Sequence, residues 1–97
     1  MFDQSNPAPQ PGTSTESYEA PVTSTEKAIV DTFEELFQID NVSVSSDIFE
    51  LGGNSLTAQQ LIWRIRDLYG FDVPLSTIFD APTARELAAE IDLLLAT

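Results

Sequence analysis

The sequence contains no cysteine and no histidine among its 97 residues. Without cysteine, the chain can form no disulfide, offers no thiol nucleophile and has no thiolate ligand for a metal. Without histidine, it also lacks the Ser-His and Cys-His pairs of many hydrolases and the most common zinc ligand. These two absences exclude the most frequent kinds of nucleophilic catalyst and of zinc site.

Basic residues and long apolar runs are scarce as well. Four Lys and Arg stand against 16 Asp and Glu, for a net charge of −12, so nucleic-acid backbones and anionic membrane surfaces are poor partners. The same charge is also typical of an acidic surface that serves only solubility. No apolar run approaches membrane-spanning length, and the chain start lacks the basic and apolar parts of a secretion signal. We therefore expect a cytoplasmic monomer that binds neither nucleic acid nor membranes.

Residues 1–22 differ in composition from the rest of the chain. They are rich in Pro, Ser, Thr and Gln and offer almost nothing to bury, which is typical of an extended linker or a disordered terminus. We predict a disordered linker over residues 1–22 and one folded domain over residues 23–97. A proline-rich spacer and an end directly after the last expected helix favour a module cut from a longer protein.

The first and last helices are predicted from caps and spacing. Thr23 precedes Glu26 by three residues, and Thr83 precedes Glu86 in the same way, as in a capping box. Apolar residues then recur at helical spacing after each cap: Ile29, Phe33, Leu36 and Phe37 in the first helix, and Leu87, Ile91, Leu94 and Leu95 in the last. Each of these two helices is expected to bury one apolar face.

Two further helices and a long loop lie between them. The second helix is predicted to start near Ser55 and to run to Tyr69, where Gly70 stops it, with an apolar side of Ala58, Leu61, Ile62, Ile65, Leu68 and Tyr69. A short third helix follows Pro74 and ends before Pro82. The loop from Gln38 to Asn54 is expected to be pinned to the core by Val42, Val44, Ile48, Phe49 and Leu51. We predict an all-α fold: a small four-helix bundle with a short third helix, a long loop between helices one and two, and a preceding disordered linker.

The run from Asp47 to Leu56 is the most informative part of the sequence. Gly52 and Gly53 allow a sharp turn where the loop meets the second helix, and they keep side chains away from Ser55. The Ser55 hydroxyl is expected at the positive end of that helix, where free amides and the helix dipole favour a phosphate. A Gly-Gly-Asn-Ser run is also ordinary capping chemistry, with Asn54 or Ser55 accepting a hydrogen bond from a helix amide. On these four residues alone, capping is the simpler interpretation.

The longer run from Phe49 to Leu56 resembles a family motif. It reproduces the Phe-Glu-Leu-Gly-Gly-x-Ser-Leu signature of the peptidyl carrier (thiolation) domains of non-ribosomal peptide synthetases, within the acyl carrier protein-like superfamily. Asn54 occupies the variable position, where this family more often has His or Asp. The order of elements from Ala20 to Ala96 is similar to the family too. The resemblance implies a covalent 4′-phosphopantetheine on Ser55, taken from coenzyme A, with Gly53, Asn54 and Leu56 around it.

The resemblance also implies a function and a set of partners. A phosphopantetheinyl transferase with magnesium would attach the arm, and the domain would carry aminoacyl or peptidyl thioesters in antibiotic biosynthesis without catalysing a reaction. Its other partners would be adenylation, condensation and tailoring or thioesterase domains. Two alternatives stay open: an acyl carrier of polyketide or fatty-acid synthesis, and an unmodified helical interaction domain. A hydrolase and an EF-hand are disfavoured, because Ser55 lacks a Gly-x-Ser-x-Gly context and the stretch from Asp40 lacks the calcium-loop spacing.

A second stripe on the second helix predicts a docking surface. Leu56, Gln59, Trp63 and Arg66 recur at helical spacing away from the apolar side. Exposed Leu56 and Trp63 beside an attachment site would suit partner recognition, although Trp63 could instead fold against the long loop or the linker. The family resemblance implies further contacts around Ile78 and Phe79 of the third helix, both of which could equally belong to the core.

Overall fold

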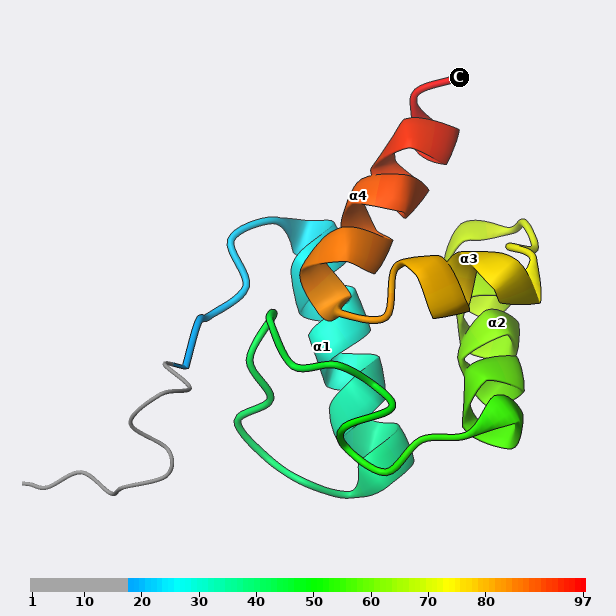
Figure 1. Ribbon diagram of the computed structural model, residues 1–97. Coiled ribbons are helices and arrows are strands. Elements are labelled where there is room, and N and C mark those ends of the chain that lie inside the picture. Colours follow the sequence, from blue (N-terminus) through cyan, green and yellow to red (C-terminus); the bar gives the residue numbers. More distant parts are fainter. Residues whose placement is uncertain (1–17) are drawn as a thin grey trace, which may run out of the picture.

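The computed structural model describes residues 18–97, and this part of the chain forms four helices and no strand. The helices are α1 (Ser24–Phe37), α2 (Ser55–Tyr69), α3 (Leu75–Asp80) and α4 (Ala84–Leu95). Helix α1 packs against both α4 and α2, and α3 packs against α2 (Figure 1). The predicted four-helix fold with its short third helix and long loop is confirmed, whereas residues 1–17 of the linker predicted over residues 1–22 lie outside the described residues.

Helices α1 and α4 begin at the predicted cap residues. The Thr23 hydroxyl accepts a hydrogen bond from the Glu26 amide at 3.0 Å, and the Thr83 hydroxyl accepts one from the Glu86 amide at 3.1 Å. The reciprocal half of each expected capping box does not form. The Glu26 carboxylate instead accepts from the Val22 amide at 2.8 Å, and the Glu86 carboxylate accepts from the Thr83 hydroxyl at 3.0 Å. Each helix therefore starts with half a capping box.

The hydrophobic core lies between the helices and is closed by the long loop. The helices contribute buried aliphatic and aromatic side chains, among them Ile29, Phe33, Leu61, Ile65, Ile78, Leu87 and Ile91. The loop adds Val42, Val44 and Ile48, which are 3%, 0% and 0% exposed. Phe49 and Leu51 are partly buried and pack against the same core. The prediction that apolar side chains pin this loop is thus confirmed.

Three leucines predicted to face the core are exposed instead. Leu68 is 52% exposed, Leu94 46% and Leu95 50%. Leu68 lines a groove of about 290 Å³ between α1 and α2, which the α1 residues Ala28, Asp31, Thr32 and Glu35 line on the other side. Leu94 and Leu95 lie beyond the start of α1, which is opposite Asp92.

A hydrogen bond places the start of α1 beside Asp92 of α4, because the Thr25 hydroxyl donates to the Asp92 carboxylate at 2.7 Å. The last turn of α4 therefore extends past its packing partner. None of the helices within residues 18–97 is long and apolar enough to cross a membrane.

Candidate functional site

The loop before α2 is folded tightly around Asp47. Its carboxylate accepts hydrogen bonds from the amides of Phe49 at 2.7 Å and Glu50 at 3.3 Å. The Leu51 amide donates to the Asp47 carbonyl at 3.0 Å, and the Ile48 amide donates to the carbonyl of Pro82 at 2.9 Å. The last bond joins the loop to the connection between α3 and α4, so the backbone is fixed before it reaches the glycines.

Gly52 and Gly53 are required for different reasons. Gly52 has a φ of 107°, which lies in a region that side chains with a Cβ rarely adopt. Gly53 instead lies against the loop, and a Cβ at this position would come within 2.7 Å of the Ile48 carbonyl oxygen. The Gly53 amide donates to that same oxygen at 3.0 Å. The first glycine therefore permits the turn, and the second permits the close approach of two backbone segments.

Asn54 is the residue that caps α2. Its side-chain oxygen accepts hydrogen bonds from the Leu56 amide at 2.9 Å and the Thr57 amide at 3.1 Å. The Thr57 hydroxyl accepts from the Asn54 amide at 3.3 Å, which completes a reciprocal capping box. Of the two cap candidates in the sequence, the structure selects Asn54. The expectation of free amides for a phosphate is wrong at Leu56 and Thr57, whose amides both donate to the Asn54 side chain.

Ser55 is the first residue of α2 and is exposed to solvent. Because Asn54 provides the cap, helix formation does not depend on the Ser55 hydroxyl. The two preceding glycines add no bulk beside it, and the next side chain, Leu56, is 64% exposed. The chain has no histidine, and no acidic cluster within residues 18–97 could hold a metal ion. The site thus presents an exposed hydroxyl at the start of a helix, which suits the attachment of a group.

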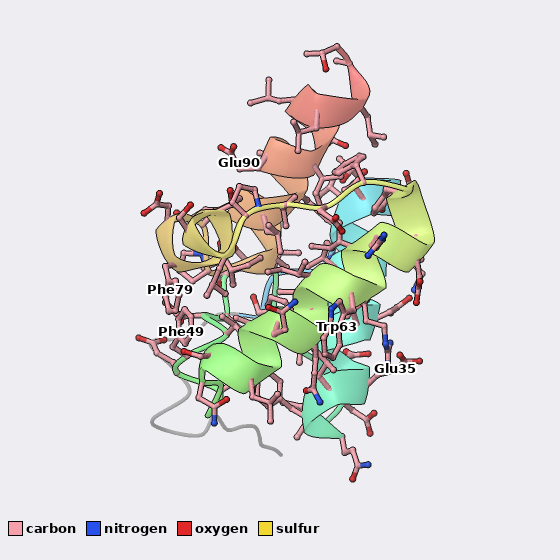
Figure 2. All side chains as sticks on the ribbon, turned by 90° about the vertical axis from the view of Figure 1, so that its right-hand side faces the viewer. Glu35, Phe49, Trp63, Phe79 and Glu90 are labelled. Carbon is pink, nitrogen blue, oxygen red and sulfur yellow. The ribbon has the colours of Figure 1, made fainter. Side chains whose placement is uncertain are left out.

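The outer face of α2 carries the predicted apolar stripe. Leu56 is 64% and Trp63 53% exposed, and Figure 2 shows Trp63 on the side of α2 that faces the viewer. Gln59 is half-buried. Arg66 lies 3.6 Å from the Asp72 carboxylate in an exposed ion pair. The exposure expected for Leu56 and Trp63 is confirmed, and the alternative in which Trp63 is covered by the loop is not what the structure has.

A stacked pair of aromatic rings joins the loop to α3. The ring centroids of Phe49 and Phe79 are 5.1 Å apart with an angle of 2° between the ring planes, and Figure 2 shows the two side chains next to each other. Phe79 is 48% exposed, whereas Ile78 is fully buried. Of the two possibilities for these α3 residues, Ile78 belongs to the core and Phe79 lies on the surface. Sequence reasoning missed the stack, because no periodicity relates residues so far apart in the chain.

Comparison with known proteins assigns this helical domain to a family. Residues 27–91 match the family model described as "Phosphopantetheine attachment site". The chain belongs to this family. Its members are non-catalytic carrier domains with 4′-phosphopantetheine as the prosthetic group. The residues described above fit such a group, since an exposed hydroxyl begins a helix whose cap is provided by the neighbouring Asn54.

Relatives of the phosphopantetheine attachment domain include large synthetases. The chain is 38% identical over 88 residues to a linear gramicidin synthase protein of Brevibacillus parabrevis, covering 91% of this chain and 2% of that protein. It is 41% identical over 87 residues to a dimodular nonribosomal peptide synthase of Bacillus subtilis (strain 168), covering 90% of this chain and 4% of that protein. The chain thus spans a few per cent of the length of these relatives. Its identity with them confirms a domain homologous to thiolation domains.

The solved structures agree with this assignment. A structure titled "Non Ribosomal PCP domain" superposes with a TM-score of 0.66 at 31% identity, covering 73% of this chain and 91% of that one. A thiolation-reductase di-domain from an archaeal non-ribosomal peptide synthetase gives a TM-score of 0.73 at 36% identity, covering 77% of this chain and 16% of that one. The helical fold predicted from the sequence is therefore that of a peptidyl carrier domain.

Proposed function

We propose that Ser55 carries the 4′-phosphopantetheine arm and that the loaded domain holds aminoacyl or peptidyl groups for a non-ribosomal peptide synthetase. The observation that carries this proposal is the geometry of the α2 start, where Ser55 is exposed while Asn54 provides the cap. The identity to gramicidin synthase and to the dimodular synthase supports the peptidyl type over the acyl carriers of polyketide or fatty-acid synthesis.

The attachment reaction needs only a nucleophile from this chain. The Ser55 oxygen forms a bond to the coenzyme A phosphorus nearer the pantetheine, the bond to adenosine 3′,5′-bisphosphate breaks, and a base of the transferase takes the hydroxyl proton. The partner for this step is a phosphopantetheinyl transferase with magnesium. The bound arm supplies a thiol, which this cysteine-free chain lacks, and acyl groups are held on it as thioesters. Gly52 and Gly53 keep the approach open, and Asn54 holds the helix start.

The remaining partners would be the other domains of the synthetase. Adenylation, condensation and tailoring or thioesterase domains would each meet the arm in turn, and the exposed Leu56, Trp63 and Phe79 are suited to contact them. We propose a cytoplasmic location and a carrier domain that includes residues 23–97, preceded by a linker.

The decisive test is the intact mass of the protein after incubation with coenzyme A, magnesium and a broad-specificity phosphopantetheinyl transferase. We expect the parent chain to gain one phosphopantetheine and Ser55→Ala to gain none. Ser24→Ala is a matched control, because Ser24 follows the cap of α1 as Ser55 follows the cap of α2, and it should load fully. Unfolding free energies should change by less than about 0.5 kcal/mol in both variants.

Two outcomes would contradict the proposal. A parent chain that is folded by circular dichroism but gains no mass would favour an unmodified interaction domain. A Ser55→Ala variant that still gains one phosphopantetheine would place the arm on another residue.

A further inference from the structure

The segment before α1 is bonded to the tip of the long loop, which consists of residues 43–46. The amide of Glu19 donates to the hydroxyl of Ser43 at 2.9 Å. In the other direction, the Val44 amide donates to the Glu19 carbonyl at 3.0 Å. Glu19 therefore uses both of its backbone groups to hold the loop, which is the behaviour of a paired segment and not of a free linker.

The same residue also contacts the first turn of α4. The Glu19 carboxylate lies 3.0 Å from the Arg85 guanidinium, and the Arg85 amide donates to the Val44 carbonyl at 3.0 Å. Glu19, Val44 and Arg85 are thus bonded to one another in a closed set. Because both charged side chains are about half exposed, the ion pair contributes little by itself, and the backbone bonds carry most of the attachment.

The other end of this segment is fixed on α1. The Val22 amide donates to the Glu26 carboxylate at 2.8 Å, and Thr23 is the cap of the helix. Between the two attachments lies Pro21, whose ring restricts the backbone and reduces the entropy lost when the segment is held. Residues 18–22 are therefore held at both ends; we call them the entry strap.

We infer that the loop tip and Arg85 form a built-in docking surface for the entering chain, with Glu19 as its anchor. This surface fixes the side of the bundle along which residues 18–22 reach the start of α1. In Figure 1 the strap lies on the left, with α2 and α3 on the right and α1 between them. The folded unit then begins no later than Glu19. The side of the bundle on which the entry strap lies does not depend on loading at Ser55. This position leaves the surface of α2 and α3 unobstructed, and that advantage rests on the proposed function.

The absence of cysteine allows a direct test in the full chain. A nitroxide on Tyr18→Cys, the only thiol, should broaden the amide resonances of residues 43–46 and Arg85 more strongly than those of Leu56 and Thr57. Equal broadening at the loop tip and at the start of α2 would overturn the inference, because it would mean that the entering chain samples both sides of the bundle.

Two pairs of substitutions in the same labelled chain then test the anchor. Ser43→Ala with Arg85→Gln removes two contacts of Glu19, and should weaken the preference for the loop tip and speed amide exchange at Val44 by about tenfold. Ser45→Ala with Arg66→Gln is the matched control: Ser45 bonds to Ser43 and Arg66 pairs with Asp72, so neither contacts Glu19. An unchanged pattern in the first pair, or the same change in the control pair, would overturn the role of Glu19.

Discussion

The first turns of α2 and α4 share their local chemistry and differ in what surrounds them. Each follows a residue whose side chain accepts a helix amide, Asn54 in α2 and Thr83 in α4. At α4, Ala84 is fully buried and Arg85 is bonded to Glu19 and Val44. At α2, Ser55 and Leu56 are both exposed.

This comparison separates two explanations of the site. The dipole and the cap are present at both helix starts, so they do not distinguish α2 from α4. The difference lies in the approach to each helix. Two glycines precede the cap of α2 and add no side chain, whereas Glu19 of the entry strap and Val44 of the loop tip both bond Arg85 at the start of α4. Openness, more than helix polarity, makes the start of α2 a candidate attachment site.

The largest expected effect comes from displacing the loop that leads into α2. Gly53→Ala brings a Cβ within 2.7 Å of the Ile48 carbonyl oxygen, so the loop must shift, at a cost of about 1–3 kcal/mol in unfolding free energy. Loading at Ser55 should slow as well. Urea unfolding and mass analysis of loading measure the two effects.

Gly70→Ala serves as the control for that substitution. Gly70 also has a positive φ, of 84°, but nothing lies within 4 Å of its added Cβ, and it is remote from Ser55 along α2. Only backbone strain of about 1 kcal/mol is expected, with normal loading. If Gly53→Ala unfolds and loads like Gly70→Ala, the close approach of the loop is not what keeps the site open.

The caps of the two helices should have equal effects on stability and unequal effects on loading. Asn54→Ala and Thr83→Ala each remove a side-chain acceptor from a helix start, and each should lower the unfolding free energy by about 1 kcal/mol. Asn54→Ala should also slow loading, because Ser55 is then held less firmly, whereas Thr83→Ala should load normally. Equal loading rates in the two variants would show that the cap of α2 has no part in presenting Ser55.

The smallest effect on stability is expected on the exposed stripe of α2. Trp63→Ala should change the unfolding free energy by less than about 0.5 kcal/mol and leave loading nearly normal, because the side chain is 53% exposed. Binding to an adenylation domain, measured by calorimetry on the loaded chain, should weaken. Leu93→Ala is the matched control, since Leu93 is 64% exposed on α4, and it should bind like the parent chain. Equal losses in both variants would argue against a specific surface on α2.

The helices and the candidate Ser55 followed from local signals in the sequence. Caps, stop residues and the Phe49 to Leu56 motif each consist of residues that are close in the sequence, so they can be recognised without knowledge of the tertiary structure. For this reason the predicted helix, starting near Ser55 and running to Tyr69, agrees with α2. The roles of the two glycines were only half predicted, because the clash at Gly53 depends on where the Ile48 carbonyl lies.

Other features could not be predicted from neighbouring residues in the sequence. Helical periodicity assigns Leu68 and Leu94 to an apolar face, but it does not say how far the neighbouring helix extends or how large its side chains are. The stack of Phe49 on Phe79 joins segments that are remote in sequence. Glu19 lies in a stretch whose composition indicates a linker, and its contacts arise only because the loop tip folds back toward the start of α4.

Capping by Asn54 makes the fold indifferent to what Ser55 carries. No hydrogen bond of the α2 cap ends on the Ser55 hydroxyl, so adding a substituent there removes no stabilising contact of the cap. Proteases that act on the transiently unfolded population respond to unfolding free energy. If Ser55 carries the proposed arm, we therefore expect the modified and unmodified chains to be degraded at similar rates, so that the modifying enzyme sets the supply of loaded carriers.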